Sequence, residues 1–312
     1  MSWKRRRSTC GTCTTSKGYY AKGGSIEMTT QQNAIDNAAA SSRIRETGIG
    51  WHKALGAARR LGGYGYPALA FVLLFGGWEL AVRLFRINPL TLPAPSGILN
   101  ALFSDFSFYL DHAGVTLYEA IVGFVIGSAL ALIGGVLMAH SPALERMLLP
   151  IAVLANVTPI VAIAPLLIIW FGFGSFPKML IAAIITFFPM LVNSITGFRS
   201  IDQNNYEYLR SLHASKAEIF FKLRLPNSLP YLFSASKTCI TLSVIGAVVA
   251  EWSGADKGLG NLVMVFSNYM QIEKMFAAIA MLAAMGIVLT AVIRIVEQRA
   301  LYWHSSTQTR EG

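Results

Sequence analysis

Three ionisable side chains fall within or at the ends of long apolar runs of the sequence. Glu119 lies near the start of one run, Lys237 lies about nine residues into another, and Glu251 ends that second run. A charged side chain is costly in lipid, so each is expected to face a cavity, a partner or the membrane interface. One interpretation of Lys237 and Glu251 is that they lie on a path for a solute. The structural alternatives are a snorkelling Lys237 and an interfacial anchor at Glu251.

Other residue types that commonly do chemistry are scattered along the chain. Cys10 and Cys13 form a single C-x-x-C in a polar stretch and would need further ligands to hold a metal. The histidines at 52, 112, 140, 213 and 304 stand singly, without an H-E-x-x-H pattern. No G-x-x-x-x-G-K-[ST] phosphate loop occurs. The sequence therefore predicts no catalytic residue, no metal site and no bound cofactor, which disfavours a membrane enzyme.

The composition predicts an all-α membrane protein. Only 13% of the 312 residues are charged, whereas soluble domains carry about 25%, and the mean hydropathy is +0.51. A helix needs about 20 mostly apolar residues to cross a bilayer. About six such runs are present: Tyr66–Phe85, Val115–Met138, Met147–Phe171, Met179–Phe198, Leu229–Ala250 and Phe276–Ile295.

Polar segments at both ends enclose this apolar region. Residues 1–60 are basic and rich in Ser, Thr, Gly and Ala, which predicts a disordered cytoplasmic tail rather than a signal peptide. Met28 offers an alternative start that would leave residues 1–27 untranslated. A polybasic lipid-binding arm is the other interpretation of this tail. Residues 61–300 are expected to form the transmembrane domain, and residues 301–312 a second cytoplasmic tail.

The distribution of positive charge orients the predicted spans. With a cytoplasmic N-terminus, 20 of the 26 lysines and arginines fall inside and four fall outside, Lys178 among them. The positive-inside rule therefore favours cytoplasmic N- and C-termini. Residues 86–112 and 252–273 are then expected outside the membrane, and residues 199–227 inside.

The second and third runs carry features of helix packing and helix breakage. Pro159 and Pro165 are expected to break the third run, either beside a water-filled pathway or as a kink for packing. Small residues in the second run recur every four positions and are expected to admit a neighbouring helix closely: Gly123, Gly127, Ala131 and Gly135.

Residues 200–230, here called the 200–230 segment, are predicted to form two short amphipathic helices. Asp202 is a suitable N-cap for a first helix that runs to Leu212. Ser215 and Glu218 form a capping box for a second helix, which is expected to stop near Arg224 because Pro follows at position 226. Such a segment predicts a surface that docks a partner. The alternative is a connector packed under its own helices.

This segment resembles the cytoplasmic "EAA" loop of binding-protein-dependent ABC transporter permeases. Glu207 matches the glutamate of that motif, and Leu223 its apolar isoleucine position. His213 replaces the motif's glycine, and a left-handed backbone is uncommon for histidine. Tyr208 and Leu209 replace the two alanines. The resemblance implies an ATPase-coupling loop that comprises Glu207, Arg210, Leu212, His213, Ser215, Glu218, Leu223, Leu225 and Pro226.

Further motifs extend the resemblance over residues 66–300. They are similar to the nitrate/sulfonate/taurine/bicarbonate family of ABC permeases. The motifs are LPAPS at 92–96, PIVAIAP at 159–165, WFGFG at 170–174, FRSID at 198–202, IGAVVAE at 245–251 and GLG at 258–260.

The resemblance implies the permease subunit of an ATP-driven importer in the bacterial inner membrane. Two permease subunits, expected to be a homodimer, would line one pathway in the lipid bilayer. Two cytoplasmic ATPase subunits would hold ATP and Mg and drive alternating access, and a periplasmic or lipid-anchored binding protein would deliver the solute. No nucleic acid is expected as a partner. The candidate pathway residues are Pro159, Pro165, Lys237 and Glu251.

Two points stay open at the level of sequence. The solute is expected to be of the sulfonate, nitrate or taurine type, or of the pyrimidine thiamine-precursor or riboflavin type. The alternative function is an ion-coupled secondary transporter, which would require buried carboxylates in mid-span and inverted repeats. Glu119 is its one candidate carboxylate, and no internal repeat is evident.

Overall fold

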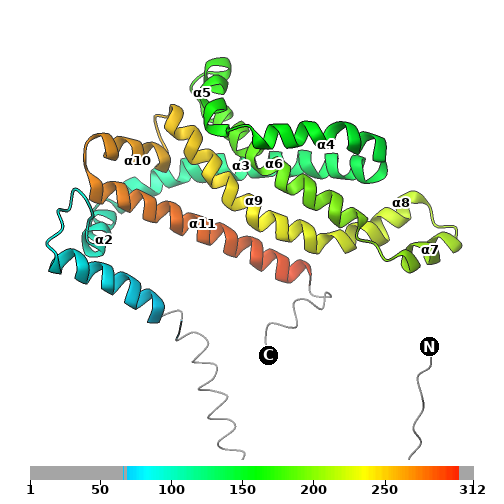
Figure 1. Cartoon of the computed structure of the whole chain (residues 1–312), viewed down its shortest axis with the longest axis horizontal. Coiled ribbons are helices and arrows are strands. Elements are labelled where there is room, and N and C mark those ends of the chain that lie inside the picture. The colour runs from blue at the N-terminus through cyan, green and yellow to red at the C-terminus, as the bar shows by residue number, and fades with distance from the viewer. Residues whose placement is uncertain (1–65, 67–68, 302–312) are drawn as a thin grey trace, which may run out of the picture. The chain divides into compact units, whose positions relative to one another are not determined.

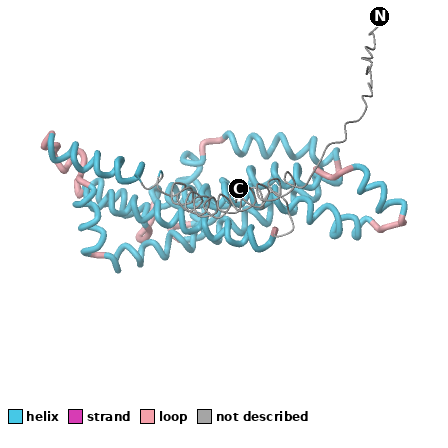
Figure 2. Tube along the Cα trace, turned by 90° about the horizontal axis from the view of Figure 1, so that it is seen from below, coloured by secondary structure: helices cyan, strands magenta, loops and turns pink. Residues whose placement is uncertain are grey.

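The computed structural model describes residues 66 and 69–301, and all of its regular elements there are helices (Figures 1 and 2). The chain divides into two units, Met1–Leu73 and Leu74–Gly312. The account below concerns the described residues of the second unit. The predicted tail over 1–60, with Cys10 and Cys13, lies outside the described residues, as do residues 302–312.

The described helices follow one another with short connections. In chain order they are α2 (Pro95–Ser104), α3 (Phe106–His140), α4 (Pro142–Val157), α5 (Ile160–Phe171), α6 (Ser175–Arg199), α7 (Gln203–Ser211), α8 (Lys216–Ile219), the π-helical turn η1 (Phe220–Arg224), α9 (Leu225–Ser253), α10 (Leu259–Asn268) and α11 (Ile272–Ala300).

Four continuous helices in the described part are long and apolar enough to cross a membrane: α3, α6, Lys216–Ser253 and α11. The pair α4 and α5 makes a fifth if a bent pair counts as one span. The sequence predicted about six. The difference lies in the first predicted run, Tyr66–Phe85, of which the structure describes a helix over residues 69–84 while residues 67 and 68 lie outside the described residues, so a span there stays a prediction.

The third predicted span is broken once rather than twice. α4 and α5 meet at 95°, and Pro159 caps the start of α5. This confirms the predicted break at Pro159. The predicted break at Pro165 is wrong, because α5 continues through it. A proline keeps helical φ and gives up one backbone hydrogen bond, and α5 tolerates that loss.

The core of the unit is the packing of α6 against both α3 and α9. On the α3 side, a Cβ added at Gly127 would overlap Thr186 Oγ1 and the carbonyl oxygen of Ala183. On the α9 side, a Cβ added at Gly246 would lie 2.8 Å from the Cα of Ala182. The close helix approach that the small residues predicted is therefore confirmed, and it extends to a third helix.

The 200–230 segment and α10 lie at opposite ends of these three helices (Figure 1). Beside α10, a second core joins α2, α3, α10 and α11 around Tyr109, Leu259 and Phe266. Figure 1 also shows α9 and α11 running side by side, and these two helices are in contact. The three-helix core thus connects two ends that carry different side chains.

The close approach at Gly127 can be tested with one methyl group. Gly127→Ala is expected to lower the midpoint of thermal unfolding in detergent, because overpacking costs about 1–3 kcal/mol. Gly114→Ala is the matched control on the same helix, since a Cβ there meets nothing within 4 Å. It should be neutral or stabilise by about 0.5–1 kcal/mol through helix propensity. Equal midpoints for the two variants would contradict the packing described here.

Candidate functional site

The first half of the 200–230 segment folds as the sequence predicts. The side chain of Asp202 accepts a hydrogen bond from the backbone N–H of Asn204 at 3.0 Å and caps α7. His213 adopts a left-handed φ of 57° just after α7. Its N–H donates to Arg210 O at 3.0 Å, while the N–H of Ala214 donates to Leu209 O at 3.1 Å. This is the Schellman pattern in which a glycine is usual. His213 therefore adopts the left-handed conformation for which the motif has glycine, at the cost of backbone strain.

The second half differs from the prediction. The capping box is present: the N–H of Glu218 donates to Ser215 Oγ at 3.2 Å, and the N–H of Ser215 donates to Glu218 Oε2 at 2.9 Å. The helix does not stop near Arg224. It continues through the π-helical turn η1 into α9, with Pro226 in the first turn of α9.

The π-helical turn accounts for this continuity. In a regular α-helix the ring of Pro226 would clash with the carbonyl group of Lys222. The wider turn displaces the carbonyl groups that precede the proline. Because of it, the 200–230 segment is joined to α9 by unbroken helix, and Leu223, Leu225 and Pro226 lie half-buried at this junction.

The exposed face of the 200–230 segment, by which we mean its solvent-exposed surface, is partly apolar. Tyr208, Leu212 and Phe221 are 64%, 61% and 64% exposed, whereas Ile219 is buried. Glu207 and Arg210 are exposed on α7. Glu207 accepts a hydrogen bond from Gln203 Nε2 at 2.8 Å, and no ion pair with Arg210 is recorded among the described residues. The two charged side chains are thus available to a partner.

Polar contacts fasten the segment to the ends of the core helices. Arg199, at the end of α6, donates to both carboxylate oxygens of Glu145 at 2.5 and 2.8 Å and to Met138 O at 3.2 Å. Asn227 Nδ2 donates to Ser200 O. The ends of α3, α4, α6 and α9 are therefore tied together beneath the exposed face.

Glu251 occupies the opposite end of α9 and is 1% exposed. Thr116 Oγ1 on α3 donates to Glu251 Oε1 at 2.7 Å. The backbone N–H groups of Gly260 and Asn261 donate to Glu251 Oε2 at 2.6 and 3.2 Å. The sequence left open a cavity, a partner or an interfacial anchor for Glu251. The partners in this structure belong to the same chain.

These contacts complete the N-terminus of α10. The first four N–H groups of a helix have no partner within the helix. Here two donate to Glu251, the N–H of Leu259 donates to Thr116 Oγ1 at 2.8 Å, and that of Gly258 donates to His112 Nδ1 at 3.1 Å in the matching tautomer. A Cβ at Gly258 would overlap the Glu251 carboxylate. The GLG motif therefore lets a buried carboxylate approach the backbone.

A buried ion pair lies beside Glu251. Lys178 Nζ is 3.1 Å from Glu119 Oε1, and both side chains are almost fully buried. The sequence placed Lys178 in an outer loop, which is wrong: α6 begins at Ser175 and carries Lys178 into the core. Glu119 also interacts with Glu251. We call His112, Thr116, Glu119, Lys178 and Glu251 the Glu251 cluster.

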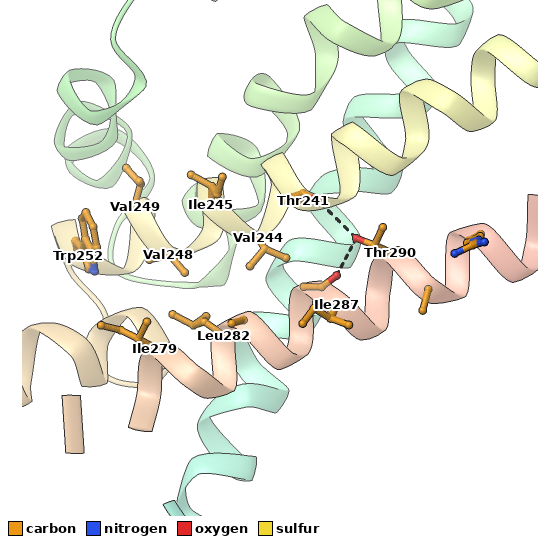
Figure 3. Close-up of a pocket in the computed structure, with 14 residues that line it drawn as sticks. Thr241, Val244, Ile245, Val248, Val249, Trp252, Ile279, Leu282, Ile287 and Thr290 are labelled. Carbon is orange, nitrogen blue, oxygen red and sulfur yellow. Dashed lines mark hydrogen bonds between the residues drawn. The ribbon is translucent and has the colours of Figure 1, made fainter. Parts of the chain in front are cut away.

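A groove of about 830 Å³ follows the contact between α9 and α11 (Figure 3). Aliphatic side chains dominate its walls, together with Trp252, two threonines and Arg294. Thr241 Oγ1 and Thr290 Oγ1 lie 3.5 Å apart within it. Lys237, one helical turn before Thr241, forms an ion pair with Glu297 at 2.5 Å. Its charge therefore has a partner on α11, whereas the sequence left a place on the solute pathway or snorkelling as the two interpretations.

The four predicted pathway residues do not come together in the structure. Pro159 and Pro165 are exposed on the α4–α5 pair, Lys237 faces α11, and Glu251 is enclosed at the far end of α9. Sequence reasoning missed His112, Thr116 and Lys178. The four-residue spacing of His112 and Thr116 places them on one face of α3, and this was the available signal.

Comparisons with known proteins agree with one another. The family model described as "Binding-protein-dependent transport system inner membrane component" matches residues 123–302. The chain is 30% identical to the formylaminopyrimidine transport permease protein ThiX of Halalkalibacterium halodurans, over 76% of this chain and 95% of that protein. It is 28% identical to the taurine transport system permease protein TauC of Escherichia coli, over 76% and 88%.

A solved structure shares the fold. The structure of the MetNI methionine ABC transporter in inward-facing conformations matches with a TM-score of 0.55 at 18% identity. The match covers 62% of this chain and 96% of that chain.

The left-handed turn at residue 213 yields a graded test. His213→Gly is expected to slow hydrogen–deuterium exchange in residues 203–219, because it removes a strain of about 1–2 kcal/mol. The exchange rate of His213→Asn should lie between those of the parent and His213→Gly. His213→Val should exchange fastest, since a β-branched residue resists positive φ. A series in which all four proteins exchange equally would refute the strained turn.

Proposed function

This chain belongs to the family of binding-protein-dependent transport system inner membrane components, and from that premise we propose that it forms the solute pathway of an ATP-driven importer. Its helices make it a multi-pass membrane protein. The pathway is completed by a second permease subunit, which we take to be another copy of this chain. We place both termini in the cytoplasm of a bacterial cell.

The exposed face of the 200–230 segment is the observation that carries the proposal. Tyr208 and Leu212 are exposed one helical turn apart at α7, Phe221 is exposed in η1, and Glu207 and Arg210 are exposed on α7. Side-chain N-caps at Asp202 and Ser215 start α7 and α8, so the backbone that carries this surface is ordered. We propose that it docks in a groove of a cytoplasmic ATPase subunit. Apolar anchors surrounded by charges are a common pattern of docking surfaces.

The mechanism that follows is alternating access. ATP and Mg are bound by the ATPase subunits, whose closure moves the two 200–230 segments. Each segment continues as unbroken helix into α9, so the movement reaches the membrane-spanning helices. The solute pathway then exchanges between two packings of the same helices. This chain performs no chemistry on the solute.

The solute is proposed to be a small organic molecule delivered by a binding protein outside the cell. ThiX is named for formylaminopyrimidine and TauC for taurine, so both types stay in the proposal. An ion-coupled carrier, the alternative considered from the sequence, is not supported by the family. Its one candidate carboxylate, Glu119, is engaged in an ion pair with Lys178.

Coupling through the exposed face can be measured with one substitution. Glu207→Ala is expected to lower the solute-stimulated ATPase activity of the complete transporter at least about tenfold, because loss of a charge at a partly buried interface costs several kcal/mol. Its level in the membrane should stay normal. Asp111→Ala, an exposed carboxylate near the start of α3, is the control and should change neither quantity. Normal stimulation in Glu207→Ala would overturn the coupling role.

The proposed orientation predicts which face each loop occupies. Single cysteines are placed at Ser107, Asn205 or Asn268 in a chain whose Cys10, Cys13 and Cys239 are replaced by serine. A membrane-impermeant maleimide added to intact cells should label positions 107 and 268. Position 205 should react only after permeabilisation. Labelling of position 205 in intact cells would reverse the orientation and with it the ATPase docking.

A further inference from the structure

Both helices that flank the 200–230 segment reach the Glu251 cluster at their other ends. α6 carries Lys178 near its start and Arg199 at its end, where the segment begins. α9 begins at Leu225 within the segment and carries Glu251 near its end. By helical rise these paths are about 32 and 39 Å long. The same two helices therefore connect the docking face to the buried cluster.

These two helices are packed so closely that one cannot shift far without the other. Near the 200–230 segment, a Cβ added at Gly197 would lie 3.1 Å from the Cβ of Ser228. Near the Glu251 cluster, Gly246 of α9 has even less room beside the backbone of Ala182. Close-packed interiors transmit displacement because they resist compression. A movement at one end of the pair is therefore expected at the other.

α10 is held to these helices by its first turn. The N–H groups of Leu259, Gly260 and Asn261 donate to Thr116 or Glu251, and His112 Nδ1 lies within hydrogen-bonding distance of both the N–H and the carbonyl oxygen of Gly258. Buried hydrogen bonds to backbone donors hold an element in place, because breaking them leaves the donors unpaired away from water. The covalent link from α9 is a short loop with positive φ at Gly254 and Gly258. Without the side-chain contacts, that loop alone would leave α10 freer to move relative to α9.

The geometry points to Glu251, Thr116 and His112 as positioning residues that make α10 follow α3 and α9 when an ATPase displaces the 200–230 segment. This inference rests on the proposed function. In the proposed orientation α10 lies on the outer face, where a binding protein delivers the solute. The nucleotide cycle inside the cell would thereby change the position of a helix on the outside.

Two other roles for Glu251 fit the structure less well. A carboxylate that receives the solute needs a free oxygen on an accessible surface, yet both oxygens accept hydrogen bonds and the side chain is 1% exposed. A contact with a second subunit would require the carboxylate to reach the surface of this chain, and it is enclosed by α3, α9 and α10. Its observed contacts therefore place its role at α10.

Hydrogen–deuterium exchange of the complete transporter in nanodiscs tests the inference. In the parent, a non-hydrolysable ATP analogue should change exchange in residues 203–211 and in residues 259–268. Glu251→Gln is expected to keep the change in 203–211 and to lose it in 259–268. Exchange in 259–268 without nucleotide should rise at least about tenfold, because charged hydrogen bonds to buried donors are lost.

Two further variants make the result decisive. Thr116→Val removes one hydroxyl at constant shape and should also uncouple 259–268 from the nucleotide, even if Glu251→Gln fails to fold. Asp256→Asn, an exposed carboxylate in the same loop, should behave like the parent. A full nucleotide-dependent change in 259–268 of Glu251→Gln or of Thr116→Val overturns the inference. A parent without any change in 203–211 refutes the proposed ATPase docking instead, so the two failures are distinguishable.

Discussion

The close approach of α6 to α3 and α9 is the constraint on which the other features of the structure depend. Helices in lipid gain little from burying apolar surface against one another, so they associate through tight packing and hydrogen bonds. Gly127 on α3 and Gly246 on α9 remove the side chains that would hold α6 away. Small residues on α6, such as Ala182, meet them from the other side. The result is a closely packed three-helix core that carries functional groups at both ends.

The two ends satisfy their polar groups in different ways. At the 200–230 segment, caps and a Schellman turn complete the backbone locally, and Glu207 and Arg210 stay exposed on the surface. At the Glu251 cluster, side chains from α3 and α9 complete the first turn of α10, and the result is buried. A site that meets a partner needs exposed groups on an ordered backbone. A site that holds a helix through its buried first turn needs the backbone donors of that turn paired.

The π-helical turn explains how the two ends can communicate. The proposed transmission of ATPase movement to the membrane-spanning helices and the proposed coupling to α10 both require continuous helix from the 200–230 segment to Glu251. Pro226 would be expected to interrupt that helix. The turn over Phe220–Arg224 accommodates the proline and keeps the chain helical. Turns of this kind often occur at functional sites, because they change the direction of side chains without ending the helix. Here the turn lies between the exposed face and the membrane-spanning part.

The sequence by itself determined the class of protein, most of its helices, the caps of the 200–230 segment and the family. These follow from local patterns: apolar length, small residues at a four-residue spacing, and capping residues next to the helices that they start. It failed at Pro165 and Pro226, because a proline limits a helix only when the surrounding structure cannot absorb one lost hydrogen bond. It also placed Lys178 in a loop, since charge alone suggested an exposed position.

Only the tertiary structure decided the partners of the buried charges. Glu251 and Thr116 are far apart in the sequence, as are Lys178 and Glu119, and each pair meets only because α3, α6 and α9 pack together. Lys237 and Glu297 meet across α9 and α11 for the same reason. A spacing pattern shows which residues share a face of one helix. It contains no information on which face of another helix lies opposite, because that is decided by how the whole set of helices fills space.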